Sequence, residues 1–364
     1  MADNNQHYNL EQVEPGMKLA EDIINQRGNV LIAEGTILDK SLLAHLLRLG
    51  VKDVQIETTT SEQEQAQTPE VTLEEIKMQH LSNAVQKIKE SFRIIEKYKK
   101  IPINILQDIT DNELWPLVSK HLSINYTNLE HSKKDYLYDH SVNVALLSGL
   151  LGLWSGYNKN QISELILTGL LHDIGKTQIP PEILNKPENL TKDELKVMQL
   201  HATYSFSLIK EVAAIPQNVK FAVLQHHERL DGSGYPGHFK QEKIHPYARV
   251  VAIADIYDAM TSERNYSHKN NPFTAVQVLT KDMYSKLDAT LCTTFLTAFC
   301  NCIIGNKVQL KDGREGEIIY TGHFLNFNLM IRMENNECLP ISDWQSIKEV
   351  TAFPTKSQEN ENQA

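Results

Sequence analysis

The stretch "ISELILTGLLHDIGK", residues 162–176, ends an apolar helical pattern with a histidine and an aspartate. Ile162, Leu165, Ile166, Gly169 and Asp173 share one face of the predicted helix, since the later four follow the first by 3, 4, 7 and 11 residues. The Asp173 carboxylate would therefore lie among apolar neighbours, where an unpaired charge is very costly. The pattern predicts a cation beside Asp173.

Four further helical patterns carry a metal-ligand side chain on an apolar face. His140 opens a strongly apolar helix, and His201, His226 and Asp255 each follow apolar residues at helical spacing. Any one of them alone is more often a hydrogen-bonded core histidine or a capping aspartate than a ligand. Five helices that each offer a nitrogen or oxygen ligand from a buried face instead favour a metal site.

The candidate ligands are all histidines and aspartates. They are His140, His172, Asp173, His201, His226, His227 and Asp255. A set of neutral imidazoles and carboxylates suits Fe, Mn or Zn, and the lack of cysteine ligands argues against a structural zinc. Seven candidates exceed what one ion needs, so they suit two ions that share a bridging carboxylate.

Composition narrows the class of protein. The chain of 364 residues is 41% hydrophobic and 23% charged, which allows two or three folded units with a sizeable core. Its net charge of −10 disfavours a nucleic-acid scaffold, so we expect neither DNA nor RNA as a partner. The longest apolar stretch, residues 142–154, is too short for a membrane span and predicts a buried helix.

The N-terminal residues and the cysteines indicate where in the cell the protein is expected. The first ten residues lack the apolar segment of a secretory signal. The four cysteines, Cys292, Cys300, Cys302 and Cys338, form no CxxC pair, and we expect them to be reduced thiols. These features predict a cytoplasmic protein.

Changes in pattern divide the chain into segments. We expect a small α+β domain over residues 1–58, a polar linker over 59–70, an amphipathic helix over 71–100, a helical domain over 101–303, a small β unit over 304–352 and a disordered tail over 353–364. Within the helical domain, Thr191 and Glu194 form a capping box at a helix start.

The helix over residues 71–100 has two interpretations. Its apolar residues alternate steps of three and four and are Met78, Leu81, Val85, Ile88, Phe92 and Ile95. Such a face either packs on its own domain or forms a coiled coil with a second copy of the chain.

The residues described so far resemble a known family. "HDIGK" at 172–176, with the histidines and Asp255 around it, resembles the HD superfamily of metal-dependent phosphohydrolases. "HHERLDGSGYP" at 226–236 and "IADIYDAMTSERNY" at 253–266 resemble its HD-GYP branch, the bacterial cyclic di-GMP phosphodiesterases. The resemblance covers residues 130–303 and implies a mainly α protein with an all-helical HD-type catalytic domain. The N-terminal unit is similar to an accessory domain often found ahead of HD-GYP domains.

The resemblance implies roles for the candidate ligands. One metal would be held by His140, His172, Asp173 and Asp255, and Asp173 would bridge to a second metal held by His201, His226 and His227. Some relatives hold a third ion with a glutamate at the position of Tyr136. The tyrosine here implies a binuclear site, with Fe or Mn as the expected ions.

The same resemblance implies how substrate is bound. Lys176 and Arg264 match phosphate-binding positions. We expect Asp173 and Lys176 to be the catalytic residues. Relatives commonly carry a basic residue where Ser267 stands here, which leaves substrate affinity or choice open.

The loop after the paired histidines is expected to line the substrate cleft with Tyr235. Gly232 and Gly234 would leave room for a dinucleotide or allow positive φ, and Asp231 would form an Asx turn. An ordinary helix-ending turn is the alternative. Glu228 has two interpretations, a residue that orients a metal-bound histidine or a solvated surface residue.

The function implied is hydrolysis of cyclic di-GMP to linear pGpG, with GMP as a further product. One alternative is a non-catalytic receptor for a cyclic dinucleotide or a partner protein. Another is a phosphodiesterase for cyclic GMP-AMP. A signalling protein and, through the helix over residues 71–100, a second copy of the chain are the further partners considered.

Overall fold

The computed structural model describes residues 73–120, 136–262, 271–325 and 328–352, and residues 5–57 apart from 15, 22, 25–29, 33–35, 37, 39–41, 44–45 and 48–50. Its contacts divide the chain into two compact units, Met1–Val71 and Thr72–Ala364. The expected linker over 59–70, the expected tail over 353–364 and the phosphate-binding candidate Arg264 lie outside the described residues.

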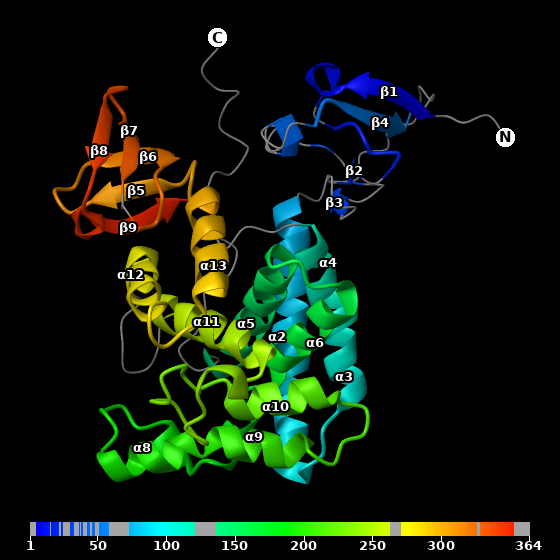
Figure 1. Cartoon of the computed structure of the whole chain (residues 1–364), viewed down its shortest axis with the longest axis vertical. Coiled ribbons are helices and arrows are strands. Elements are labelled where there is room, and N and C mark those ends of the chain that lie inside the picture. The colour runs from blue at the N-terminus through cyan, green and yellow to red at the C-terminus, as the bar shows by residue number, and fades with distance from the viewer. Residues whose placement is uncertain are drawn as a thin grey trace. The chain divides into compact units, whose positions relative to one another are not determined.

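The first unit contains two pairs of antiparallel strands. Strand β1 (Asn5–Asn9) pairs with β4 (Asp53–Glu57), and β2 (Ile23–Ile24) pairs with β3 (Val30–Ile32) (Figure 1). A 3₁₀ turn, η1 (Leu10–Gln12), follows β1. Buried leucines, isoleucines and valines give this unit a small core of its own.

The second unit is mainly helical, as predicted (Figure 1). Its α-helices are α2 (Leu73–Tyr98), α3 (Ile103–Asp108), α4 (Trp115–Ser119), α5 (Tyr136–Trp154), α6 (Lys159–Leu171), α7 (Pro181–Leu184), α8 (Lys192–Gln199), α9 (His201–Ile209), α10 (Gln217–Gln225), α11 (Pro246–Thr261), α12 (Pro272–Asp282) and α13 (Ala289–Cys302). A π-helical turn, η2 (Ile109–Leu114), joins α3 to α4, and a 3₁₀ turn, η4 (Ile174–Gln178), follows α6. The predicted capping box of Thr191 and Glu194 begins α8.

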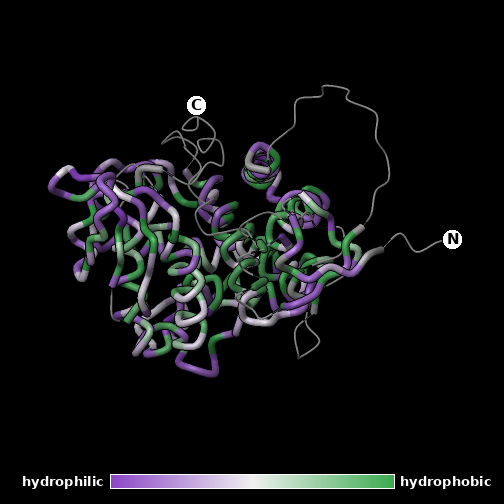
Figure 2. Tube along the Cα trace, turned by 90° about the horizontal axis from the view of Figure 1, so that it is seen from above, coloured by the Kyte–Doolittle hydropathy of each residue, from purple (hydrophilic) through white to green (hydrophobic). Residues whose placement is uncertain are grey.

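Helix α5 lies in the centre of this unit. Every residue from Asp139 to Gly152 is buried, which confirms the buried helix predicted for residues 142–154. It packs against α6 and α11, the two helices that deliver the predicted HD pair and the last predicted ligand. In Figure 2 the most hydrophobic stretches lie inside the helical part and hydrophilic ones at its periphery. Burial of apolar surface around α5 therefore positions the site.

Helix α2 packs on its own domain, the first of its two interpretations. Leu81, Ile88, Phe92 and Ile95 are buried in the same hydrophobic cluster as residues of α5 and α6. This face is therefore covered and is not free to pair with a second copy. Met78 departs from the predicted stripe, because it is 49% exposed.

The unit ends in an antiparallel sheet of five strands, in agreement with the predicted β unit. The strands are β5 (Lys307–Leu310), β6 (Glu315–Thr321), β7 (Leu329–Met333), β8 (Cys338–Ile341) and β9 (Ile347–Ala352), in the order β8-β7-β6-β5-β9. Val308, Ile318 and Ile331 are buried in one cluster with Phe295 and Phe299 of α13. The sheet and helices α11–α13 therefore share a continuous core.

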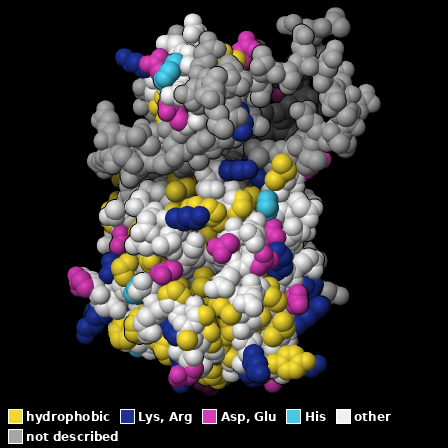
Figure 3. Space-filling model, turned by 90° about the vertical axis from the view of Figure 1, so that its right-hand side faces the viewer, with side chains coloured by type: hydrophobic (Ala, Val, Ile, Leu, Met, Phe, Trp, Pro, Cys, Tyr) yellow, Lys and Arg dark blue, Asp and Glu magenta, His cyan; other side chains and the backbone are white. Residues whose placement is uncertain are grey.

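On the face shown in Figure 3, acidic and basic side chains are interspersed over the described residues. Within the described part of the chain, no helix combines the length and apolar character needed to cross a bilayer.

Candidate metal centre

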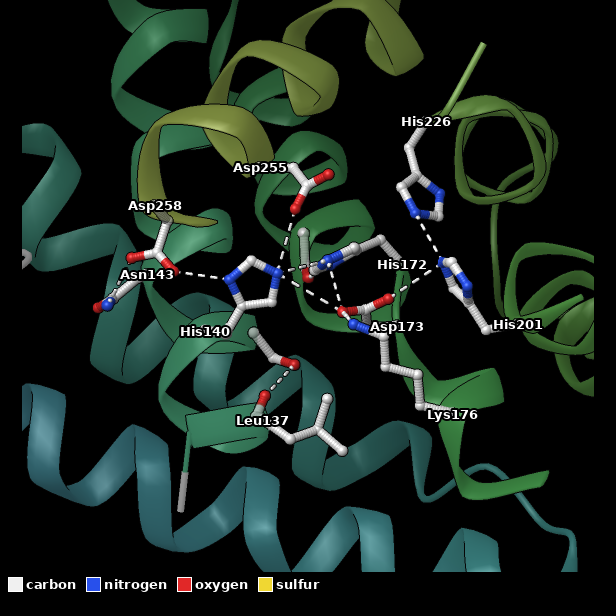
Figure 4. A network of polar contacts seen from close by, with 12 residues as sticks. Leu137, His140, Asn143, His172, Asp173, Lys176, His201, His226, Asp255 and Asp258 are labelled. Carbon is white, nitrogen blue, oxygen red and sulfur yellow. Dashed lines mark hydrogen bonds and ion pairs between the residues drawn. The ribbon is translucent and has the colours of Figure 1, made fainter. Parts of the chain in front are cut away.

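All seven predicted ligands come together in the helical unit. His140 lies in the first turns of α5, His172 and Asp173 follow α6, and His201 opens α9. His226 and His227 follow α10, and Asp255 lies within α11. Figure 4 shows six of these side chains pointing toward one another, those of His140, His172, Asp173, His201, His226 and Asp255. Helix ends supply most of them because side chains there can turn into the space between packed helices.

One group of donor atoms surrounds His140. Its Nε2 lies 3.2 Å from Oδ1 of Asp255 and 3.4 Å from Nε2 of His172. Oδ2 of Asp173 lies 3.3 Å from the same His172 nitrogen and 3.5 Å from His140 Nε2. These four residues are the predicted ligands of the first metal.

A second group surrounds His201. Its Nε2 lies 3.3 Å from Nε2 of His226 and 3.1 Å from Nε2 of His227. It also lies 3.3 Å from Oδ1 of Asp173. Asp173 therefore presents one carboxylate oxygen to each group, the arrangement that a bridging ligand requires.

The hydrogen bonds behind three imidazoles decide which nitrogen faces the centre. Nδ1 donates to the carbonyl three residues earlier in His172 (2.6 Å), His201 (2.7 Å) and His226 (2.7 Å). A carbonyl can only accept, so the proton lies on Nδ1 and Nε2 presents a lone pair. The short Nε2–Nε2 contacts thus bring acceptors together.

A buried acceptor without a donor lies among these lone pairs. Oδ1 of Asp173 is buried and has no hydrogen-bond partner. An orphaned carboxylate oxygen is costly unless a cation or donor meets it. The donor set, the converging lone pairs and the orphaned oxygen all fit bound divalent ions, and His/Asp clusters able to hold metal lie here.

The electrostatics of the second group keep its histidines neutral. Burial, reinforced by nearby His172 and His201, lowers the pKa of His226 to about 3. Burial also lowers the pKa of His201 and, together with His226, holds that of His227 well below its usual value. Metal binding needs neutral imidazoles, so no proton must leave these residues at neutral pH.

In the first group, interactions with neighbouring side chains outweigh the effect of burial on the pKa values. Burial lowers the pKa of His140, but its hydrogen bonds with Asp255 and Asp258 outweigh burial and raise the pKa to about 9. Burial raises the pKa of Asp173, yet its interactions with His172 and Lys176 outweigh burial and hold the pKa well below the ordinary value. The carboxylate is therefore ionised and ready to bind a cation.

Lys176 lies at the edge of the centre. Its ammonium forms an ion pair with Oδ2 of Asp173, three residues earlier (Figure 4). Its side chain remains 20% exposed, whereas that of Asp173 is 1% exposed. Lys176 thus has one side toward the ligands and one toward solvent.

Both sequence interpretations of Glu228 are wrong. The residue is 3% exposed, so it is not a solvated surface residue. Its carboxylate accepts hydrogen bonds from the backbone N–H groups of Gly237 (2.6 Å) and Phe239 (3.0 Å), not from a histidine. Sequence reasoning missed this because the partners lie nine and eleven residues further along the chain.

The loop after the histidines, residues 229–239, is called here the GYP loop. Gly232 has φ +82°, which confirms the expected positive φ, and Asp231 forms the predicted Asx turn with the N–H of Ser233 (2.9 Å). Gly234 has a different reason: a Cβ there would lie 2.3 Å from the His227 carbonyl oxygen. The Tyr235 ring lies against that of His227, with centroids 4.6 Å apart.

Two residues that hold parts of the candidate centre in place were not predicted from the sequence. Asp258 is 1% exposed and accepts hydrogen bonds from His140 Nδ1 (2.6 Å) and Asn143 Nδ2 (2.8 Å). Ser205 accepts from the N–H of Gly175 and donates to the carbonyl of His172, both at 2.8 Å, which ties α9 to the turn after α6. A signal for Asp258 was present, since it follows Asp255 by three residues on one helix.

The candidate metal centre lies in a part of the chain that matches a known family model. Residues 126–291 match the family model of the HD domain. This part of the chain is therefore similar to HD domains, and the relatives that follow agree with the resemblance to the HD-GYP branch. The HD domain family is metal-dependent, as the donor set requires.

Several curated proteins are similar to parts of this chain. Cyclic di-GMP phosphodiesterase PA4108 of Pseudomonas aeruginosa is 35% identical over 185 residues, which are 51% of this chain and 44% of that protein. Cyclic di-GMP phosphodiesterase PdeB of Borreliella burgdorferi is 30% identical over 196 residues, 54% of this chain and 52% of that protein. 3'3'-cGAMP-specific phosphodiesterase 1 of Vibrio cholerae is 40% identical over 139 residues, 38% of this chain and 32% of that protein. The chain spans about half the length, or less, of these relatives.

A solved structure shares the fold. Bd1817, an HDG"Y"P protein from Bdellovibrio bacteriovorus, matches with a TM-score of 0.50 over 80% of this chain and 98% of its own. At 17% sequence identity the similarity concerns the fold alone.

Proposed function

We propose that this protein is a binuclear metal-dependent phosphodiesterase that hydrolyses cyclic di-GMP to pGpG, with GMP as a further product. The observation that carries the proposal is the convergence of the Nε2 lone pairs of His201 and His172 on the buried Asp173, with His226 grouped beside them. Curated relatives of the HD domain that are named as cyclic di-GMP phosphodiesterases support the substrate.

The ligands divide into two sets around Asp173. We assign one ion to His140, His172, Asp173 and Asp255, and the other to His201, His226, His227 and Asp173. Fe or Mn suits these ligands. When bound, two such ions activate water as a nucleophile and polarise a phosphoryl oxygen.

The chain's own residues bind and orient the phosphodiester. Asp173, with one oxygen toward each group, fixes the separation of the two sets. The Lys176 ammonium lies beside it and has access to solvent, so it is placed to bind a non-bridging phosphate oxygen and to stabilise charge there. Tyr235 covers His227 and forms one wall of the substrate site.

A second substrate has a specific observation in its favour. Three relatives are named as 3'3'-cGAMP-specific phosphodiesterases, one of them at 40% identity. Ser267, the departure that left substrate choice open, lies outside the described residues. Cyclic GMP-AMP is therefore the second candidate substrate for the same site.

The proposal includes the organisation of the chain. We assign catalysis to residues 101–303, an accessory α+β role to residues 1–58 and a supporting β unit to residues 304–352. The covered face of α2 does not support a coiled-coil dimer through residues 71–100.

Turnover of cyclic di-GMP by the purified full chain tests the function. It is assayed without oxygen, with added Fe²⁺ or Mn²⁺, beside Asp173→Ala and the matched variant Asp193→Ala, whose side chain is 90% exposed. We expect metal-dependent release of pGpG or GMP that Asp173→Ala abolishes and Asp193→Ala retains. Binding without turnover by the metal-loaded chain would instead identify a receptor. Turnover of cyclic GMP-AMP alone would assign the second substrate.

A further inference from the structure

Glu228 follows the two metal-ligand histidines but points away from the metal centre, into the GYP loop. Both of its carboxylate oxygens are engaged, Oε1 by the N–H of Gly237 and Oε2 by the N–H of Phe239. Hydrogen bonds to a carboxylate are roughly twice as strong as neutral ones. A buried carboxylate with two backbone donors thus fixes the far side of the loop.

The near side of the loop packs on the same short segment. The N–H of Tyr235 donates to the carbonyl of His227 (3.2 Å). Gly234 lies so close to this segment that a Cβ would come 2.5 Å from the Arg229 nitrogen. The loop therefore folds back over residues 227–229. Tyr235 contacts His227, and the residues just after it are held by Glu228.

The base of the loop is also closed. The N–H of Gln241 donates to the carbonyl of Leu230 (3.3 Å), and the N–H of Leu230 donates to the carbonyl of Lys286 (2.9 Å). Arg249 of α11 donates to the carbonyl of Gln241 (2.8 Å). Because the base of the loop is already held by these contacts, the path of the rest of the loop depends on the hydrogen bonds to Glu228.

We propose that Glu228 is a positioning residue: it holds residues 234–239 so that the Tyr235 ring lies against His227 and forms the wall of the substrate site. The proposal rests on the proposed function. It assigns Glu228 no contact with metal or substrate, because Gly237 and Phe239 occupy its two oxygens. Its effect reaches the reaction through Tyr235.

The first experiment measures the loop itself, without reference to activity. Hydrogen–deuterium exchange of peptides within residues 229–241 is compared in the wild-type chain, Glu228→Gln and Glu113→Gln. Glu113 is a matched control, because it is a buried glutamate in another part of the helical unit, 5% exposed. We expect the amides of Gly237 and Phe239 to exchange at least about tenfold faster in Glu228→Gln only, since that change replaces one of the two oxygen acceptors with an amide nitrogen. Unchanged exchange would overturn the anchor.

The second experiment links the anchor to the reaction through a double-mutant cycle with Tyr235→Leu. We expect Glu228→Gln to lower kcat/KM at least about tenfold, mainly through KM, and to add little when Tyr235 is already leucine. Bound metal per chain and the unfolding midpoint should stay near the wild-type values. Independent addition of the two effects, or loss of metal in Glu228→Gln, would overturn a role through Tyr235.

The outcomes separate this proposal from the proposed function. A wild-type chain with no turnover of either dinucleotide, together with faster exchange in Glu228→Gln, refutes the function while supporting the anchor. Turnover by the wild-type chain with unchanged kcat/KM in Glu228→Gln refutes the positioning role alone.

Discussion

Nδ1 of His140 lies 2.6 Å from Oδ2 of Asp258, while Nε2 of the same ring lies 3.2 Å from Oδ1 of Asp255. One imidazole of α5 is thus held between two carboxylates of α11. Asn143 also donates to Asp258, so the carboxylate is fixed from a second point on α5. This relationship sets the ring plane of His140 before any ion binds.

Replacing the Asp258 carboxylate with an amide should therefore lower the affinity of the centre for metal. Asp258→Asn removes the charged acceptor that orients His140, and loss of such partners typically lowers metal affinity by roughly 10–100-fold. Isothermal titration with Mn²⁺ measures the change, with the exposed Asp193→Asn as control. Equal Mn²⁺ affinity in the two variants would show that Asp258 does not act through the histidine.

Removal of metal should destabilise the fold. The converging lone pairs and the orphaned Oδ1 of Asp173 lose their cation when a chelator is present. An ion at 100 times its Kd adds about 2.7 kcal/mol to the stability of the state that binds it. Differential scanning calorimetry should show a higher Tm with Mn²⁺ than with EDTA in the wild-type chain. Asp173→Ala should show little difference, and a wild-type Tm indifferent to Mn²⁺ would argue against the centre.

Stability should depend on pH through Glu113. Burial raises the pKa of this carboxyl, but hydrogen bonds from Lys87 and His80 outweigh burial and lower it below the ordinary 4.5. The stabilisation is therefore complete above pH 4.5 and is lost as the pH falls through the lowered value. Denaturant unfolding of the wild-type chain and Glu113→Gln should differ at pH 7, with the gap closing in acid. A gap that widens on acidification would contradict the ion-pair account.

The sheet should unfold together with the helical unit. Ile331 of β7 is fully buried in the cluster that includes Phe295 and Phe299. Ile331→Ala leaves a cavity in this shared core, which typically destabilises by about 2–5 kcal/mol. We expect a single unfolding transition for helices and sheet, shifted to lower denaturant, when unfolding is followed by far-UV circular dichroism and by the fluorescence of the three tryptophans. Separate transitions would mean that the sheet is independent.

Five of the candidate metal ligands could be predicted because each lies on an apolar helical stripe, where the sequence leaves a polar residue without another explanation. The other two, His172 and His227, are direct sequence neighbours of members of this set. Asp258 was missed although it lies on the same helix as Asp255. Its carboxylate accepts a hydrogen bond from a histidine, and the sequence pattern of such an aspartate does not differ from that of an aspartate that caps a helix. Glu228 was misread for another reason. Its partners are backbone N–H groups, which every residue carries, so only the folded path of the loop reveals them.

The β strands show the same limit. The β unit over residues 304–352 could be predicted as a whole, but β8 contains Pro340 and β9 follows a 3₁₀ turn, η6 (Trp344–Ser346), so neither has a clear pattern of its own. Which face of α2 was covered also depended on tertiary packing, since a heptad pattern serves both interpretations.

The bonds from His172, His201 and His226 to carbonyls three residues earlier have a further consequence. Each ring is tied to the last turn of its own preceding helix, α6, α8 or α10. The orientations of these helices therefore fix the directions from which the three nitrogen atoms would approach a bound ion. Ions that require a different arrangement of ligands would bind less tightly. The spectrum of a bound paramagnetic ion would change if these helices moved.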